Sequence, residues 1–118
     1  MNTKDKIDFI GNWIKSYATS NNFESLVIGI SGGIDSSVTS TLSAKTGLKT
    51  IVANMPILDH KITNDRGMSH IHWLKENFEN VEDLKIDLSD VFNNFKSALN
   101  KNNSEHGYAN SQARIRTV

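Results

Sequence analysis

The chain has 118 residues, which is enough for one small domain with a modest core and too few for a second independent domain. Its 13 basic side chains balance its 13 acidic ones, so no general field draws it to nucleic acid or to an anionic membrane surface. The lack of cysteine excludes disulfides, thiolate metal sites and cysteine nucleophiles from these residues. With a charged start that resembles neither a signal peptide nor a membrane span, the composition predicts a soluble, cytoplasmic protein.

The first predicted element is an amphipathic helix over roughly residues 4–18. We interpret its apolar stripe as core packing, with a partner surface as the alternative; the stripe consists of Ile7, Ile10, Trp13, Ile14 and Tyr17. A nearly continuous apolar run follows at residues 26–30, which is typical of a strand that is covered on both faces. This run favours a parallel sheet.

Two more strands are predicted further along the chain. A helix after Gly32 and Gly33 can end at Gly47, and residues 48–56 then form a second strand that ends at the only proline. We expect a polar connection over residues 58–65, a helix over 66–78 and a third strand over 82–88. In the helix over 66–78, Met68, Ile71 and Leu74 recur at one-turn spacing, with Lys75 as the alternative to Leu74.

The last third of the chain is predicted to contain two helices. Ser89 can cap the first of them, whose shared apolar face comprises Val91, Phe92, Phe95 and Leu99. Residues 100–110 are polar and read as a surface loop, and a second helix begins at Asn110 or Ser111. Three strands that alternate with helices make a βαβαβ unit with an extra helix at each end, which is an α/β layer architecture.

The junction "SGGIDSS", residues 31–37, lies where a buried strand leads into a helix. Ligands of parallel α/β proteins bind at this edge of the sheet. Gly32 and Gly33 permit positive φ and leave no Cβ between backbone and ligand, and the first amides of a helix lack internal partners. Ser31, Ser36 and Ser37 add hydroxyl donors. Together these residues predict a phosphate-binding loop.

Two other phosphate loops do not fit this junction. A Walker loop needs a lysine before its last Ser or Thr, and a dinucleotide fingerprint needs a third glycine; the junction has neither. Asp35 on the first helical turn could be a favourable charge at the helix N-terminus. Beside a polyphosphate it would repel the ligand unless a divalent cation bridges the two. We therefore predict Asp35 as a metal ligand.

The "SGGIDSS" junction resembles the signature of the N-type ATP pyrophosphatases, which cleave ATP between the α- and β-phosphates. The resemblance implies a Rossmann-like parallel sheet of the adenine-nucleotide alpha-hydrolase type, with helices on both faces. Two further stretches narrow the family. "VANMP", residues 52–56, resembles the place where these enzymes seat adenine and ribose, and "ANSQARIRTV", residues 109–118, resembles the "GN-x-x-AR-x-R-M" helix of ammonia-dependent NAD synthetases. Ala109 and Thr117 depart from that pattern.

The resemblance to NAD synthetases implies a ligase that adenylates nicotinic acid adenine dinucleotide (deamido-NAD) and then amidates it with ammonia. It implies ATP and Mg²⁺ as substrate and metal, with Asp35 as the metal ligand, and a homodimer. The implied ATP-binding residues are Gly29, Ile30, Ser31, Gly32, Gly33, Ile34, Asp35, Ser36, Ser37 and Met55. Asn110, Arg114 and Arg116 match the motif positions implied to bind substrate, and the arginines would meet phosphate or the dinucleotide. No catalytic residue is assigned.

Geometry limits what the arginines and histidines of the chain can do. Arg114 and Arg116 diverge by about 200° on a regular helix, so both cannot face one ligand, and which of them does so is left open. His70 and His72 have the same spacing. We expect them to be surface histidines and not a helical metal pair.

Alternative functions remain: another N-type ATP pyrophosphatase resembling GMP synthetase, asparagine synthetase or a tRNA-modifying enzyme, or a non-catalytic adenine-nucleotide-binding module. In these residues one short helix precedes the loop and cysteine is absent, so we expect the ammonia to be free ammonia or to come from a separate protein, and not from a glutaminase segment. NAD synthetases are about twice this length. The resemblance therefore implies that residues 1–118 are the N-terminal part of a single ATP-pyrophosphatase domain, inactive alone, with the first strand at an open sheet edge.

Overall fold

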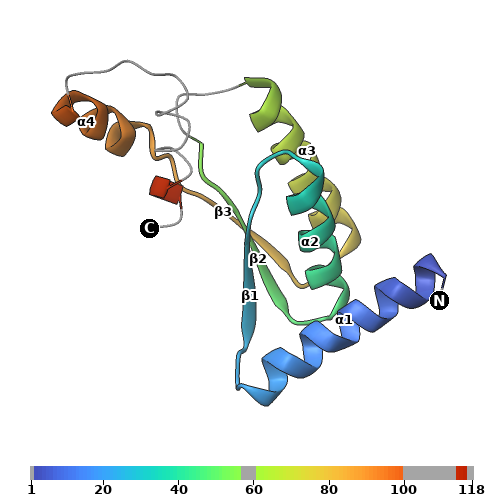
Figure 1. The fold of residues 1–118 in the computed structure, drawn as a ribbon. Coiled ribbons are helices and arrows are strands. Elements are labelled where there is room, and N and C mark those ends of the chain that lie inside the picture. Colours follow the sequence, from blue (N-terminus) through green and yellow to red (C-terminus); the bar gives the residue numbers. More distant parts are fainter. Residues whose placement is uncertain (1, 57–60, 100–113, 117–118) are drawn as a thin grey trace.

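The computed structural model describes residues 2–56, 61–99 and 114–116, which form a parallel sheet with helices packed against it (Figure 1). Helices and strands alternate along the chain, and the α/β class expected from the sequence is confirmed. The elements are α1 (Thr3–Ser20), β1 (Ser25–Gly29), α2 (Ile34–Lys45), β2 (Lys49–Asn54), α3 (Lys61–Asn77), β3 (Val81–Lys85) and α4 (Ser89–Leu99).

The sheet has the strand order β1-β2-β3, and both strand pairs are parallel. Val27 of β1 lies opposite Ile51 of β2, which in turn lies opposite Glu82 of β3. Within the described residues β1 is therefore an edge strand, as expected. Because the strands are parallel, their carboxyl ends meet at one edge, and the glycine junction begins at the carboxyl end of β1.

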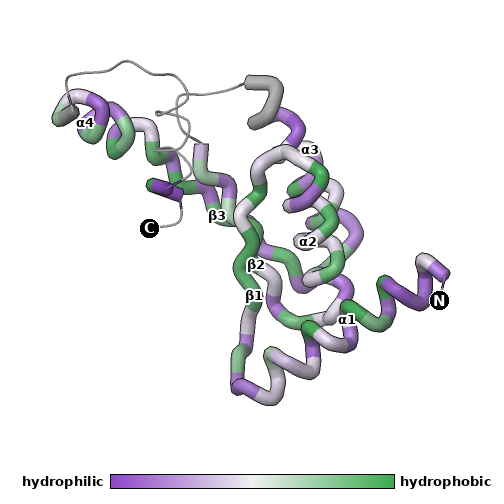
Figure 2. Tube along the Cα trace, in the orientation of Figure 1, coloured by the Kyte–Doolittle hydropathy of each residue, from purple (hydrophilic) through white to green (hydrophobic). Residues whose placement is uncertain are grey.

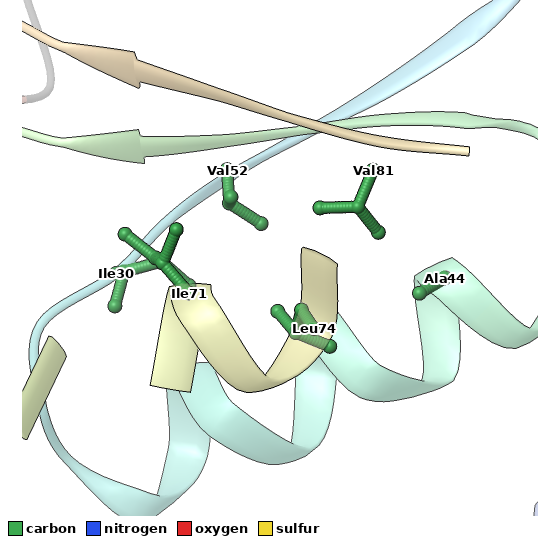
Figure 3. Packing of buried hydrophobic residues seen from close by; sticks show 6 residues of the cluster. All are labelled: Ile30, Ala44, Val52, Ile71, Leu74 and Val81. Carbon is green, nitrogen blue, oxygen red and sulfur yellow. The ribbon is translucent and has the colours of Figure 1, made fainter. Parts of the chain in front are cut away.

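The core lies between the sheet and one layer of two helices, α2 and α3. Ile71 and Leu74 of α3 and Ala44 of α2 pack against Val52 and Val81 of the strands, as Figure 3 shows. Ile30, directly after β1, completes this cluster and is 7% exposed. The predicted one-turn spacing of apolar residues in α3 is confirmed, with Met68 packed against the same cluster.

The other face of the sheet is much more open in the described residues. Val27 of β1 is 67% exposed and Leu84 of β3 is 47% exposed. Figure 2 shows the apolar character of β1 in green. A parallel sheet ordinarily has both faces covered.

The apolar stripe of helix α1 is more exposed than its interpretation as core packing predicts. Ala18 is its buried residue, whereas Trp13 and Tyr17 are more than half exposed and Ile10 is exposed as well. The helix packs against α2, and the side chains of Ile7 and Ile14 on that side are half-buried. A helix that meets one neighbour buries one narrow stripe, so the core interpretation is wrong for Trp13 and Tyr17 in the described structure.

The start of α3 and the bounds of β3 differ from the boundaries predicted from the sequence. Helix α3 begins at Lys61, within the segment expected to be a polar connection, and β3 spans Val81–Lys85, earlier than expected. Residues 58–60 of that connection lie outside the described residues.

Ser89 is the first residue of α4, not a cap that precedes it. The carboxylate of Asp87 accepts a hydrogen bond of 2.9 Å from the Ser89 amide. This bond satisfies a donor of the first turn. The expected apolar face of α4 is also only partly buried: Phe92 is buried, whereas Val91 and Phe95 are exposed.

The predicted surface loop at residues 100–110 and the start of the last helix lie outside the described residues. Residues 114–116 form a helical turn. No helix within the described ranges combines the length and hydropathy that a membrane span requires.

Candidate phosphate-binding site

The junction between β1 and α2 forms a tight loop at the carboxyl edge of the sheet. Gly32 has a φ of +86°, in the left-handed region that side chains other than glycine rarely adopt. Gly33 then occupies the N-cap position of α2 and, being glycine, makes no side-chain hydrogen bond to the first turn. The first amides of α2 thus face the loop without a capping side chain, which is the arrangement that favours an anion.

Hydroxyl groups hold the loop in shape. The Ser31 and Ser36 hydroxyls lie 3.0 Å apart, and the Ser31 amide donates to the Ser36 hydroxyl at 3.1 Å. The Gly33 amide donates to the Ser31 hydroxyl at 3.1 Å, and the Ser37 hydroxyl donates to the Gly33 carbonyl at 2.9 Å. The serines that the sequence suggested as ligand donors therefore also fix the backbone of the loop.

Asp35 and Ile34 lie on the first turn of α2 and are both exposed. The Asp35 backbone carbonyl accepts a hydrogen bond of 2.8 Å from the Thr39 hydroxyl. Among the described residues, no group of three or more His, Cys, Asp or Glu side chains could hold a metal ion. A single exposed carboxylate beside an anion cradle suits Mg²⁺, which commonly binds one or two carboxylates together with phosphates and waters.

Helix α3 supports the loop from behind. A Cβ on the buried Gly67 would come within 3.3 Å of Ile30 Cγ2 and 3.8 Å of the Gly32 amide nitrogen. The side chain of Ile30 packs in the core, and its amide donates to the Ala53 carbonyl at 2.8 Å. Ile30 therefore anchors the loop to the sheet, and its side chain is not available to a ligand.

Met55 and Arg116 meet at the carboxyl end of β2. The Nε of Arg116 donates to the Met55 carbonyl at 2.9 Å, and the Met55 Cε atom would lie 3.3 Å from a Cβ on Gly29. Arg116 is half-buried, and this burial lowers the pKa of its guanidinium, whereas Arg114 is exposed. The structure thus separates the two arginines and brings Arg116 to the predicted adenine seat. Asn110 lies outside the described residues.

His70 is a residue that sequence reasoning missed. Its Nε2 lies 2.9 Å from the hydroxyl of Ser40 on α2, so the expectation of a surface histidine is wrong for His70. Burial lowers the pKa of His70, and a hydrogen bond with the Ser37 backbone opposes this effect. His72 is exposed, as expected. The available signal was the position of His70 three residues after Gly67 and four before Leu74, on the inner side of α3.

A groove of about 410 Å³ lies among α1, α2 and α3, away from the glycines of the loop. The surface of the groove is almost wholly apolar. Its lining consists of Ile7, Ser37, Val38, Thr41, Leu42, Lys45, His70 and Trp73. Neither Asp35 nor a loop glycine lines it. The groove is therefore separate from the candidate phosphate-binding loop.

A parallel sheet with a glycine loop leading into a helix at its carboxyl edge defines an α/β protein of the nucleotide-binding kind. The family model described as NAD synthase matches residues 6–118. The chain belongs to the NAD synthase family. No match was found among curated proteins.

Solved structures with the same fold include three synthetases. The chain is 27% identical to the NMN synthetase from Francisella tularensis, with a TM-score of 0.84 over 98% of this chain and 47% of that one. The NH3-dependent NAD synthetase from Campylobacter jejuni is 23% identical, with a TM-score of 0.82 over 99% of this chain and 49% of that one. The NAD+ synthetase from Burkholderia pseudomallei is 15% identical, with a TM-score of 0.77 over 99% of this chain and 54% of that one. The chain thus spans about half the length of these proteins.

Proposed function

We propose that the whole protein is an ATP-dependent ligase of NAD biosynthesis that amidates deamido-NAD with ammonia. The observation that carries the proposal is the glycine loop between β1 and α2, which contains no lysine and bears Asp35 on the first helical turn. Membership of the NAD synthase family supports it. The position of the loop at the carboxyl edge of the parallel sheet supports the proposal, because ligands of parallel α/β proteins commonly bind at this edge.

In this proposal the loop holds the β- and γ-phosphates of ATP. The contributing residues are Gly29, Ser31, Gly32, Gly33, Ile34, Asp35, Ser36 and Ser37, with Met55 at the adenine seat. Ile30 contributes by anchoring the loop to the sheet. Backbone amides around Gly32 and Gly33 bind the departing pyrophosphate without a lysine. Asp35 would hold Mg²⁺, which neutralises charge that gathers on the leaving group.

The proposed reaction has two displacements. A carboxylate oxygen of the substrate attacks the α-phosphorus, the bond from that phosphorus to the bridging oxygen breaks, and pyrophosphate leaves. Ammonia then attacks the acyl carbon of the adenylate, AMP leaves, and a proton is released. The chain's own residues act in the first displacement by fixing the phosphates in line for attack.

The substrate side of the proposal rests on the C-terminal motif residues Asn110, Arg114 and Arg116. A guanidinium suits phosphate because its planar fork can make paired hydrogen bonds to the oxygens. The bond from Arg116 Nε to the Met55 carbonyl fixes the direction of that fork beside the end of β2. Arg116 is therefore the better candidate for a dinucleotide contact.

A second candidate product is nicotinamide mononucleotide. The Francisella tularensis neighbour is named an NMN synthetase, and its 27% sequence identity with this chain is higher than that of the two NAD synthetases described above. The acid form of that mononucleotide would undergo the same activation and amidation. We also infer a cytoplasmic homodimer from the family resemblance.

The experiment uses the whole protein with ATP labelled at the α- or the γ-phosphate, ammonia, Mg²⁺ and either deamido-NAD or nicotinic acid mononucleotide. We expect AMP and pyrophosphate in amounts equal to the amide, with deamido-NAD the better acceptor. Preference for the mononucleotide would select the second candidate. ADP and phosphate as the main products would contradict both.

A further inference from the structure

Helix α2, which carries the phosphate loop, is built from residues that weaken helices. Six of its 12 residues are Ser or Thr. Several of their hydroxyls bond back to carbonyls of the preceding turn, such as Thr39 to Asp35 at 2.8 Å and Thr41 to Ser37 at 2.7 Å. Such bonds bend helices and slightly destabilise them, and Ser and Thr have only modest helix propensity. The N-terminal half of α2 therefore gains from support by a neighbouring element.

His70 of α3 supplies such support at the second turn of α2. Its Nε2 lies 2.9 Å from the hydroxyl of Ser40, whose side chain is fully buried. The Ser40 hydroxyl itself donates to the Ser37 carbonyl at 3.1 Å. The roles in the Ser40–His70 bond depend on the imidazole tautomer: with the Ser40 hydrogen on the Ser37 carbonyl, the matching tautomer carries its hydrogen on Nε2 and donates to the Ser40 oxygen.

The contact continues from Ser37 to the loop. Both the amide and the hydroxyl of Ser37 donate to the Gly33 carbonyl, at 3.3 and 2.9 Å. Gly33 is the N-cap of α2 and donates its own amide to the Ser31 hydroxyl. An unbroken series of hydrogen bonds thus joins α3 to the phosphate loop through Ser40 and Ser37.

The Ser40–His70 pair is not a nucleophile and its base. Ser40 has no exposed surface, and its hydroxyl hydrogen is directed at a helix carbonyl. Burial lowers the pKa of His70, which favours the neutral form of the ring over the charged one. The ring also stacks on Trp73, with centroids 5.8 Å apart, which fixes its orientation. These features suit a group that orders its neighbours.

We propose that His70 is a positioning residue that holds the phosphate loop ready for ATP through Ser40. The proposal rests on the proposed function, because ATP is the ligand whose binding it affects. If the second turn of α2 loosens, the loop must be ordered when ATP binds, and part of the binding free energy is lost. The KM for ATP should then rise while kcat at saturating ATP stays close to its original value.

The test compares four variants of the whole protein. His70→Leu removes the hydrogen bond but keeps an apolar side chain, and His70→Gln keeps an N–H donor near the position of Nε2. Ser40→Ala removes the acceptor with little change of volume. His72→Leu is the matched control, because it makes the same change at an exposed position of the same helix.

We expect His70→Leu and Ser40→Ala to raise the KM for ATP about five- to tenfold, the size of one net hydrogen bond, with kcat within about twofold. His70→Gln should recover most of the loss, His72→Leu should change neither constant, and combining Ser40→Ala with His70→Leu should add nothing further. An unchanged KM in His70→Leu, or a His70→Gln variant as impaired as His70→Leu, would overturn the proposal.

Amide hydrogen exchange without ATP separates this proposal from the proposed function. Amides of residues 37–41 should exchange faster in His70→Leu and Ser40→Ala than in the unchanged protein or in His72→Leu. Equal exchange in all of them would overturn the contact between α3 and α2. If the unchanged protein fails to bind ATP, the proposed function fails, and the exchange measurement still decides the structural role of His70.

Discussion

The phosphate loop and the apolar cluster beneath it are neighbours in the chain but are held by different forces. The loop consists of glycines and exposed or half-buried serines, and hydrogen bonds of 2.9 to 3.3 Å set its shape. The cluster around Val52 and Leu74 is buried, and its apolar side chains have no hydrogen-bonding groups. Ile30 belongs to both regions. Stability and ligand recognition should therefore be separable by substitutions only a few residues apart.

The largest effect on stability is expected in the cluster. Leu74→Ala in this chain of 118 residues should lower the free energy of unfolding by about 2–5 kcal/mol, because it leaves a cavity among buried side chains. Val27→Ala, on the open face of the sheet, should cost less than about 0.5 kcal/mol. Denaturant unfolding measures both values. Equal losses would show that the two faces of the sheet are packed alike.

A smaller loss is expected where the loop itself needs glycine. Gly32→Ala should cost about 1–2 kcal/mol, because its φ of +86° is strained for a residue with a Cβ, and ATP binding should weaken as well. The matched control is Gly11→Ala in the middle of α1, where a Cβ meets no atom within 4 Å. That variant should be more stable by about 0.5–1 kcal/mol. Changes of the same sign in the two variants would contradict the assigned loop conformation.

A still smaller effect is expected at the rim of the core, where Lys75 Nζ lies 2.7 Å from a carboxylate oxygen of Asp83. The hydrogen bond from Lys75 lowers the pKa of Asp83 below its usual value. A lowered pKa in the folded state contributes stability that is present above the unfolded pKa of about 4 and is lost as the pH falls through the lower folded value.

Both side chains of this pair are more than 40% exposed, so solvent screening limits the contribution to less than about 1 kcal/mol. Asp83→Asn should reduce stability slightly at pH 7 and flatten the loss of stability as the pH falls below about 4. Acid unfolding curves measure the difference. Asp8→Asn, which removes the more exposed pair with Lys4 on α1, is the control and should change neither value. If stability falls equally with pH in Asp83→Asn and in the unchanged protein, the Lys75–Asp83 pair does not contribute to stability.

The two regions also differ in how well the sequence predicts them. The loop was predictable because its signals are local: paired glycines, hydroxyls and a helix start directly after an apolar strand. The cluster was predictable in α3, where Ile71 and Leu74 recur at helical spacing and are buried. The apolar stripes of α1 and α4 did not predict burial correctly. Periodicity shows which side chains can be buried together, but it does not show whether a neighbouring element covers them.

Contacts between distant segments were the least predictable. His70 lies 30 residues from Ser40, and nothing in the spacing of the two histidines indicates a partner on α2. Arg116 and Met55 are 61 residues apart, and the motif that includes Arg116 suggests a ligand contact and not the Met55 carbonyl. The formation of such pairs depends on how α2, α3 and the turn at residues 114–116 pack together. Local sequence patterns do not determine that packing.

The separation of stability from recognition is tested most directly at Asp35. Mg²⁺-ATP binding by calorimetry and thermal melting without ligand should be measured on the same samples of the whole protein and its Asp35→Asn variant, with Asp5→Asn in the first turn of α1 as the control. We expect Asp35→Asn to weaken Mg²⁺-dependent ATP binding by at least about tenfold through loss of the metal ligand. The melting temperature should stay nearly unchanged in both variants, because a charge at a helix N-terminus contributes at most about 1 kcal/mol. Unchanged ATP affinity in Asp35→Asn, or a loss of affinity matched by a large fall in melting temperature, would contradict the account.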